Sequence, residues 1–442
     1  MSMRYVSFNR LGGLKALQRS RSARSETAKS SCQVPLLNDD GDVLSRTRTV
    51  RSDSERLAQV LGATTKTNQF GEYLSVRCWC AQPARYSPDL RALKLLMPEA
   101  PEVVADPEQW LFLDTETTGL AGGSGTYAFL VGVAWWEGGG LEIEQFFMRE
   151  YSEERSFLFA LRERIAEHPV IVTFNGKSFD WPLLETRYRM SRKISVPSPT
   201  AHLDFLHPAR NLWRLRLGSV RLSELERHVL GWDRGADLLS GLIPQIYFDY
   251  LRGSPPERLV PVLNHNQLDV RGLAALSSRI LSLLGDAENL GQDGLELFGV
   301  SRICEKRGEH TRARNLYEKS IASFLPTETD RAARRSLARL AKRQGDFGLA
   351  CQLWKDAVGN SRHGYEAYEQ LAIYYEHKAR DPEQARQIVR QALDELRRGI
   401  QVGDIAPGPY RELKARFDRR MERLERKSRR PLLDVLAMQA QA

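Results

Sequence analysis

The 442-residue sequence predicts an α/β domain with a mixed sheet, followed by an all-α region of helical repeats. Two observations predict the α/β domain. Three apolar strand segments follow one another as a meander, and strands then alternate with amphipathic helices, which together are typical of a sheet with an antiparallel edge. One observation predicts the all-α region: beyond residue 290, small and large residues recur at a nearly constant period.

Five strands are expected in the sheet, because five short apolar segments are bounded by turn residues or acids. They cover residues 110–114, 127–136, 141–148, 169–174 and 201–205. Helical patterns cover 152–167, a segment from about 178, 219–230 and 256–284. The α/β domain is therefore assigned to residues 106–284. Residues 61–105 are expected to form a short extension before it, with a possible strand at 73–80.

The repeat pattern consists of three groups of residues with identical offsets, which lie 37 and 35 residues apart. The groups are Gly308, Ala313 and Tyr317; Gly345, Ala350 and Trp354; and Arg380, Ala385 and Val389. A small residue followed four positions later by a large one resembles the second helix of a tetratricopeptide repeat, whose period is ~34 residues. About three helical hairpins are expected within residues 290–400. The alternative is a generic helical bundle.

The positive charge of the chain is concentrated at its two ends. The net charge is +9, to which residues 1–60 contribute +5, residues 401–430 another +5 and Asp434 −1, so that the body from 61 to 400 is neutral. Residues 1–60 are rich in Ser and Arg and are expected to be disordered. Residues 401–442 are expected to form a basic tail. Basic ends favour nucleic acid as a partner, whereas the alternative is that they are simply solvated.

Composition excludes other classes of protein. A hydrophobic content of 42% supports a real core and excludes a wholly disordered chain. The longest near-continuous apolar run has ten residues, Tyr127–Trp136, against the ~20 that a membrane span needs. Five cysteines do not form a disulfide framework, and Cys78 and Cys80 are expected to be ordinary thiols. We therefore expect a cytoplasmic protein without a membrane partner.

Four acids and a histidine carry the strongest chemical signal. Asp114 and Glu116 end the first strand and, being two apart, point to the same side of the sheet. Asp180 follows another buried strand, and Asp269 lies on a predicted helix one turn after His265. Carboxylates placed side by side repel one another unless a cation binds them, and hard divalent cations prefer oxygen ligands.

Four carboxylates can balance two divalent ions, an arrangement that suits in-line displacement at a phosphodiester. A neighbouring histidine can accept the proton of the attacking water near neutral pH. Alternatively, His265 is a helix-surface residue that is only hydrogen-bonded to Asp269.

These motifs also carry a family resemblance. The segment Phe112–Leu120, which reads FLDTETTGL, resembles the first motif of the DEDD (DnaQ-like) exonucleases, which have the ribonuclease H fold. Asn175–Asp180 is similar to the second motif of B-family polymerase proofreading domains, and Ser219–Leu225 to a helix between their later motifs. The run Gly122–Tyr127, Asp204–His207 and His265-Asn266 resemble the YprB-like ribonuclease H-like exonuclease family, whose members can carry a C-terminal tetratricopeptide region.

The resemblance implies an activity and a set of roles. Asp114, Glu116, Asp180 and Asp269 would be the metal ligands and His265 the general base. Thr117 and Asn175 are assigned to substrate contact, although for Asn175 the favoured interpretation is that it fixes the loop that carries Asp180. Two divalent ions, Mg²⁺ or Mn²⁺, would be the cofactors. The third motif departs from the family pattern, since its four-residue spacing is that of the tyrosine-bearing branch although it carries a histidine.

Three further features are assigned structural roles. Asp204 is expected to cap a helical segment that begins at Phe205, with direct metal contact as the alternative. Lys177 is expected to be a solvated loop lysine, although it could meet a phosphate. The Gly122–Gly125 loop lacks the GxxxxGK pattern of a P-loop, so nucleotide binding of that kind is not expected.

The sequence therefore predicts a metal-dependent 3′–5′ exonuclease that hydrolyses single-stranded DNA or RNA from 3′ ends. An endonuclease on the same fold is the first alternative. A catalytically inert nucleic-acid-binding scaffold, with a protein partner bound by the helical repeats, is the second.

Overall fold

The computed structural model describes residues 54–81, 90–119, 123, 125–235, 237–290, 293–360 and 364–439. From Glu55 onward these residues belong to one compact unit. Residues 1–60 are expected to be disordered. Residues 1–53 of this segment lie outside the described residues, and residues 54–61 are helical. The glycine loop at 122–125 lies partly outside them as well, because residues 120–122 and 124 are not described.

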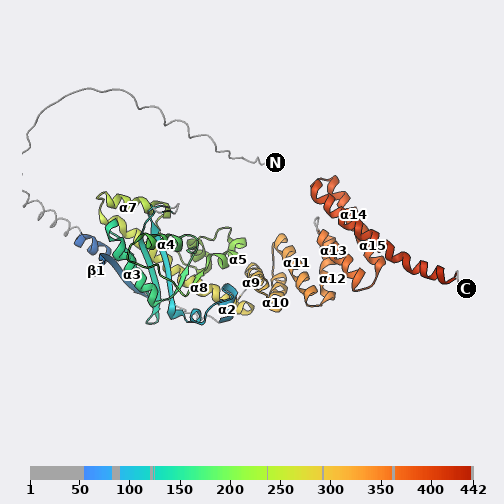
Figure 1. The fold of residues 1–442 in the computed structure, drawn as a ribbon, viewed down its shortest axis with the longest axis horizontal. Helices are drawn as coiled ribbons and strands as arrows, with labels where there is room; N and C mark the ends of the chain where they lie inside the picture. Colours follow the sequence, from blue (N-terminus) through green and yellow to red (C-terminus); the bar gives the residue numbers. More distant parts are fainter. Residues whose placement is uncertain are drawn as a thin grey trace, which may run out of the picture. The chain divides into compact units, whose positions relative to one another are not determined.

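A mixed sheet forms the N-terminal part, as predicted (Figure 1). Seven strands among the described residues make this sheet, in the order β1-β2-β5-β4-β3-β6-β7. Pairs on the β1 side of β3 are antiparallel, whereas β3, β6 and β7 are parallel. The strands are β1 (Thr64–Asn68), β2 (Gly71–Cys80), β3 (Trp110–Thr117), β4 (Ala128–Glu137), β5 (Gly140–Phe147), β6 (Val170–Thr173) and β7 (Ala201–Asp204).

The expected number of five strands is wrong, because the segment 61–105 contributes β1 and β2 to the antiparallel edge. The polar sequence of β1, TTKTN, carries no apolar pattern, and its residues are mostly exposed. An edge strand of this kind is held by its hydrogen-bonding partner rather than by burial, so periodicity could not reveal it.

Both faces of the sheet are covered. Alternate residues of β3 enter two separate cores: Trp110 and Phe112 pack on one face, and Leu111 and Leu113 on the other. The first core contains residues of α2, α5 and α8, and the second contains residues of α3, α4 and α7. These helices are α2 (Leu90–Leu96), α3 (Glu154–Glu167), α4 (Asp180–Met190), α5 (Leu206–Leu217), α6 (Leu222–Leu225), α7 (Ile243–Leu251) and α8 (Val260–Leu290).

The helix expected at 219–230 is divided. α6 is followed by a π-helical turn at Glu226–Leu230, and Gly231 ends it with a positive φ of 70°. 3-10 turns cover Glu102–Ala105, Pro107–Gln109, Tyr151–Glu153, Ser240–Leu242 and Pro256–Leu259. α8 contains a break in helical geometry at Asp286, close to the predicted domain boundary at 284.

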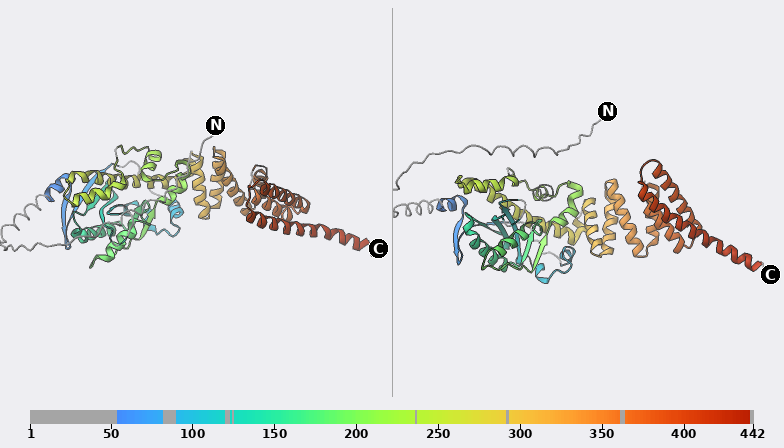
Figure 2. Two further views of the ribbon diagram at one scale, coloured as in Figure 1. Left: turned by 90° about the horizontal axis from the view of Figure 1, so that it is seen from above. Right: turned by 45° about the horizontal axis from the view of Figure 1, so that its top comes forward.

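An all-helical region follows the sheet domain, and Figure 2 shows its helices succeeding one another to the C-terminal side. It consists of α9 (Gly294–Lys306), α10 (His310–Ala322), α11 (Thr327–Arg343), α12 (Phe347–Asn360), α13 (Tyr365–His377), α14 (Pro382–Gln401) and α15 (Pro407–Gln439). Within the described ranges, no helix is long and apolar enough to cross a membrane.

The three groups of equivalent residues lie at equivalent places in this region. Gly308, Gly345 and Arg380 follow α9, α11 and α13, and all have positive φ, of 84°, 83° and 55°. The three alanines, Ala313, Ala350 and Ala385, are fully buried on the next helix. This agreement explains why the offsets repeat: each turn needs a left-handed residue, and each helix crossing needs a small one. The assignment to tetratricopeptide repeats stays a prediction.

Residues 401–442, expected as a basic tail, include the long helix α15, which packs on α14 and α13. Phe417 and Leu424 are buried in this contact. Part of the positive charge is neutralised there, because Arg420, Arg423 and Lys427 all form ion pairs with Glu376.

Candidate active site

The four predicted acids come from three elements that meet at one end of the central strand. Asp114 and Glu116 lie on β3, which pairs with β4 on one side and β6 on the other. Asp180 is the first residue of α4, and Asp269 lies on α8, which packs against β3. The pairing of β3 with β4 shifts register between Glu116 and Thr117, so the regular strand ends at the acids.

The charges of these acids act on one another. Burial raises the pKa of Asp114 well above its usual range, and the carboxylates of Asp269, Glu116 and Asp180 raise it further. Burial likewise raises the pKa of Glu116, together with the charges of Asp269 and Asp180. The pKa of Asp180 is also raised, chiefly by burial. The structure therefore brings all four acids together, at a point where their negative charge is only partly compensated.

Asn266, which is fully buried on α8, holds the Asp114 carboxylate. Its Nδ2 donates to Asp114 Oδ2 at 2.9 Å, and its Oδ1 accepts from Nε2 of Gln145 at 2.8 Å. This approach needs a glycine on β4, since a Cβ at Gly132 would lie 2.1 Å from Asn266 Oδ1. Gly132 and Asn266 together fix one carboxylate of the cluster.

The Asp180 carboxylate is held by β3 itself, because Thr115 Oγ1 donates to Asp180 Oδ1 at 2.5 Å. Thr117, predicted to contact substrate, donates from its hydroxyl to the carbonyl of Gly119 at 2.9 Å. Asn175 has a positive φ of 72°, and its backbone N–H donates to Asp204 Oδ1. Asn175 lines a cavity of about 430 Å³ together with Arg234, His265 and Asp269, whereas the described contacts of Thr117 are local.

Asp204 is the anchor of the loop that precedes α4. Its carboxylate accepts from the N–H groups of Asn175, Lys177 and Leu206, at 2.9 to 3.0 Å. Leu206 is the first residue of α5, whose N-cap is Phe205 and not Asp204 as expected, so Asp204 holds the start of the helix from one residue before the cap. The charge of Asp204 also contributes to the raised pKa of Asp180.

His265 faces the acids from one turn before Asp269. Its Nδ1 lies 2.8 Å from Asp237 Oδ1, and its Nε2 lies 3.4 Å from Asp269 Oδ2 and 3.3 Å from Ser240 Oγ. Ligand atoms of Glu116, His265 and Asp269 all lie within 4.8 Å of one another. His265 is therefore a buried part of the cluster and not a helix-surface residue, its side chain being 7% exposed.

Arg234 supplies a cation to one side of the cluster. Its Nη2 donates to Asp269 Oδ1 at 2.6 Å and to Glu226 Oε1 at 2.7 Å, and its Nη1 donates to Asp237 Oδ2 at 3.0 Å. Burial opposes the charge of Arg234, but these carboxylates outweigh it and raise its pKa. Gly272 on α8 leaves room for Glu226, because a Cβ there would meet Glu226 Oε1 at 1.5 Å.

Sequence reasoning missed Arg234, Asp237 and Glu226, and assigned no role to Asn266. Arg234 and Asp237 lie in the irregular segment between the π-helical turn and α7, where no period marks a residue. Two glycines could have indicated a close approach of other side chains: Gly132 interrupts an otherwise bulky strand, and Gly272 lies inside a long helix.

Residues 111–281 match the family model of the RNase_H superfamily. The chain is 30% identical to the uncharacterized protein YprB of Bacillus subtilis (strain 168) over 287 residues, which are 64% of this chain and 69% of that protein. The chain belongs to the YprB-like family of the RNase H superfamily.

One solved structure is also similar in part to this YprB-like chain. It is the family B DNA polymerase from the hyperthermophilic archaeon Pyrobaculum calidifontis, at 16% identity and a TM-score of 0.34. The match covers 46% of this chain and 29% of the polymerase.

Family membership and the acid cluster together support a nuclease-type function for this YprB-like protein. The RNase H-like domain implies a nucleic acid partner and the use of divalent metals. The residues fit such a metal: burial and the charges of neighbouring acids raise the pKa values of Asp114 and Glu116, and carboxylate oxygens are the ligands that hard divalent cations prefer. Arg234 reaches Asp269, whereas the oxygens of Glu116 have no described hydrogen bond or ion pair.

Proposed function

We propose that this protein is a metal-dependent 3′–5′ exonuclease that hydrolyses phosphodiester bonds of single-stranded DNA or RNA. The observation that carries the proposal is the cluster of four carboxylates at the end of β3, where burial and the charges of the other acids raise the pKa values of Asp114 and Glu116, and burial raises that of Asp180. A buried cluster of like charges is costly to fold unless a cation is bound to it.

In this proposal Asp114, Glu116, Asp180 and Asp269 hold two divalent ions, Mg²⁺ or Mn²⁺. When bound, the ions would supply Lewis-acid stabilisation of the attacking and leaving oxygens. The chain's own contribution is to hold the carboxylates in place. Asn266 fixes Asp114, Thr115 fixes Asp180, and Arg234 fixes one oxygen of Asp269, which leaves its other oxygen facing His265.

His265 acts as the general base, and Asp237 orients it. When Nδ1 donates its proton to Asp237 Oδ1, Nε2 is left as an acceptor on the side of Asp269 and Glu116. In that tautomer Nε2 can take a proton from the attacking water, and the Asp237 carboxylate stabilises the imidazolium that results. Asp237 is therefore a positioning residue.

The direction of attack rests on the resemblance of the His265–Asp269 turn to exonuclease motifs. Asn175, at the rim of the cavity beside the cluster, and Thr117 are proposed to contact the strand near its 3′ end. We also propose that α9–α14 form tetratricopeptide-like repeats that bind a protein partner, and that the protein is cytoplasmic.

The test uses the purified full chain with single-stranded DNA and RNA labelled at either end, in Mg²⁺, Mn²⁺ or EDTA. Asp114→Asn keeps an oxygen that accepts from Asn266 and removes one charge. It is expected to lower hydrolysis at least ~1,000-fold, because a metal ligand is lost. Asp394→Asn, which changes an exposed acid on α14, is the matched control and is expected to leave activity unchanged.

The pattern of products distinguishes the proposed function from its alternatives. Metal-dependent shortening from the 3′ end, lost in Asp114→Asn, supports the proposal. Internal cuts would replace it with an endonuclease. Binding that persists in EDTA, with no cleavage in any metal, would replace it with an inert scaffold, and undiminished turnover in Asp114→Asn would refute the assigned ligands.

A further inference from the structure

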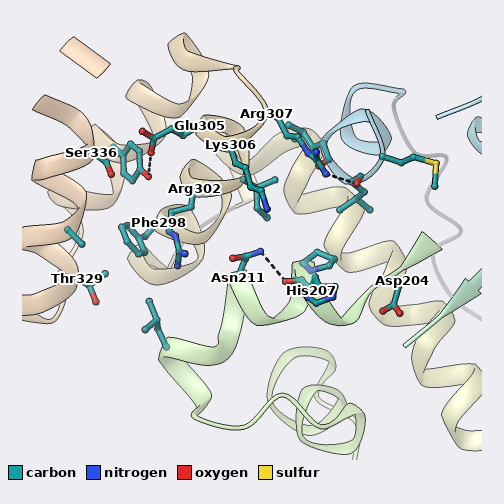
Figure 3. A pocket seen from close by; sticks show the side chains of 18 of the residues that line it. Asp204, His207, Asn211, Phe298, Arg302, Glu305, Lys306, Arg307, Thr329 and Ser336 are labelled. Carbon is teal, nitrogen blue, oxygen red and sulfur yellow. Dashed lines mark hydrogen bonds between the residues drawn. The ribbon is translucent and has the colours of Figure 1, made fainter. Parts of the chain in front are cut away.

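A large cavity lies between the sheet domain and the first helices of the helical region (Figure 3). Its volume is about 940 Å³. One wall comes from the loop after β6, from β7 and from α5; the opposite wall comes from α9 and α11. Neither the acid cluster nor His265 lines it, so its role is separate from that of the cluster.

The cavity is preformed, because its two walls are packed directly on each other. Trp213 of α5 donates to Glu296 Oε1 of α9 at 2.7 Å, and a Cβ at Gly299 would lie 2.5 Å from the carbonyl oxygen of Asn211. Arg307, at the end of α9, donates to the carbonyls of Leu95 and Leu96, both at 2.8 Å. These contacts hold α9 against the sheet domain.

Three cations that line this cavity have no acidic partner in the described part of the chain. Lys177, Arg302 and Lys306 are exposed, and their side chains have no ion pair or hydrogen-bond partner in the described part of the chain. Figure 3 shows Arg302 and Lys306 extending from α9 toward the space that His207 and Asn211 border from α5. Arg302 also lies over the ring of Phe298, at 5.8 Å.

The acids that line the cavity are already satisfied. Asp204 accepts three backbone N–H groups. Glu305 pairs with Arg339 at 2.7 Å and accepts from the Tyr317 hydroxyl at 2.9 Å, and Glu328 pairs with Arg331. The cavity therefore has a surplus of positive charge, and its ligand is expected to be an anion.

One short loop joins this cavity to the acid cluster. Asn175 lines the small cavity beside His265 and Asp269, whereas Lys177, two residues later, lines the large one. The backbone N–H groups of both residues donate to the same carboxylate, that of Asp204. The charge of Asp204 in turn acts on Asp180 of the cluster. The two cavities thus lie on either side of one anchored loop.

We propose that the large cavity binds the phosphate backbone of the nucleic acid strand whose end lies at the acid cluster, with Lys177, Arg302 and Lys306 contacting phosphates. This inference rests on the proposed function for the identity of the anion. A nucleic acid fits better than an acidic protein segment, because a single loop separates the large cavity from the acid cluster, and that cluster suits a phosphodiester. The first helices of the helical region thereby become part of the substrate path.

The test compares two double variants of the full chain. Arg302→Gln with Lys306→Gln removes two cations from the cavity. Arg343→Gln with Arg390→Gln removes two exposed cations of α11 and α14 that lie outside it and have no described partner, so the change in charge is matched. Affinity for 5′-fluorescein-labelled 20-nucleotide single strands of DNA and RNA is measured by anisotropy in EDTA over a range of KCl concentrations.

The cavity variant is expected to bind about tenfold more weakly at 50 mM KCl. The slope of log affinity against log salt should fall by about 1.4 in magnitude, because two phosphate contacts on a single strand contribute ~0.7 each. The control variant is expected to stay within about twofold of the wild type. Equal affinity and slope in the cavity variant and the wild type would overturn the inference.

A second substrate separates this inference from the proposed function. Bis(p-nitrophenyl) phosphate contains one phosphodiester and is too small to span both cavities. The cavity variant is expected to hydrolyse it at the wild-type rate, whereas Asp114→Asn should not. If the wild type hydrolyses neither this ester nor a strand, the proposed function fails, while a cavity-dependent loss of strand binding still supports the inference.

Discussion

Buried carboxylates at two places on the same sheet have pKa values that are shifted in opposite directions. Glu144 on β5 is 1% exposed and accepts from Lys66 at 2.9 Å, Ser75 at 2.7 Å and Arg164 at 2.9 Å. Burial opposes its ionisation, but these partners outweigh burial and lower its pKa to about 2. Asp114 and Glu116 on β3 are also buried, yet neighbouring acids surround them and their pKa values rise.

The difference shows what the acid cluster lacks. Around Glu144 the chain provides Lys66, Arg77 and Arg164, so the protein can balance a buried charge with its own side chains. At the end of β3, among the described residues, the cluster has an ion pair with Arg234, and Arg234 is shared among Asp269, Asp237 and Glu226. Glu144 is thus neutralised by the protein itself, whereas the cluster is proposed to take up cations from solution.

The largest effect within this comparison is expected from Gly132→Ala. The new Cβ would overlap Asn266 and displace the group that holds Asp114, so hydrolysis should fall about 100-fold or more. Gly348→Ala on α12, where the nearest atom is 3.7 Å away, is the matched control and should leave hydrolysis unchanged. Activity of Gly132→Ala within twofold of the wild type would refute a role for the Asn266 contact.

Glu144→Gln is expected to act on stability rather than activity. Loss of the charge leaves Lys66 and Arg164 without their shared partner, so the free energy of unfolding should fall by about 2 kcal/mol. Urea unfolding measures this, and Glu142→Gln on the same strand is the control. Asp114→Asn, which relieves repulsion, should leave the metal-free protein as stable as the wild type or more so. Equal losses in Glu144→Gln and Asp114→Asn would contradict the distinction between the two groups.

Asp237→Asn should lower kcat about tenfold with little change in KM, because His265 loses the carboxylate that orients it but substrate contacts remain. Asp233→Asn changes an acid of the same loop whose carboxylate, within the described part of the chain, accepts from the N–H of Gly235, and it should leave both constants unchanged. A rise in KM with kcat constant would instead assign Asp237 to substrate binding.

The smallest effect concerns Glu376, whose partners lie on α15. Burial opposes its ionisation, but hydrogen bonds from Arg423 and Lys427 lower its pKa to about 2, from an ordinary value of 4.5. A lowered pKa means that the stabilisation is complete above pH 4.5 and is lost as the pH falls toward 2. The difference in unfolding free energy between wild type and Glu376→Gln, about 1 kcal/mol at pH 6, should therefore shrink by pH 3. A difference independent of pH would show that packing, not charge, holds α15.

The sequence predicted which side chains lie together better than it predicted what holds them. Asp114 and Glu116 lie two apart near the end of a strand, Asp180 begins a helix, and His265 and Asp269 lie one turn apart on another helix, so local spacing alone places these side chains. Asn266, Arg234 and Asp237 act through contacts between elements distant in the chain, which no local period encodes. In the sheet, the apolar strands were predictable because burial selects their residues. β1 was not, because only its neighbour defines it.

The most direct test of an acid cluster arranged for cations is calorimetric titration of the metal-free full chain with MgCl₂ and with MnCl₂. The wild type and Glu144→Gln are expected to bind at least one of these ions, with a stoichiometry of up to two per chain, and Asp114→Asn should bind fewer ions or bind them more weakly. Binding by Asp114→Asn equal to that of the wild type, or no binding by the wild type of either ion, would contradict this account.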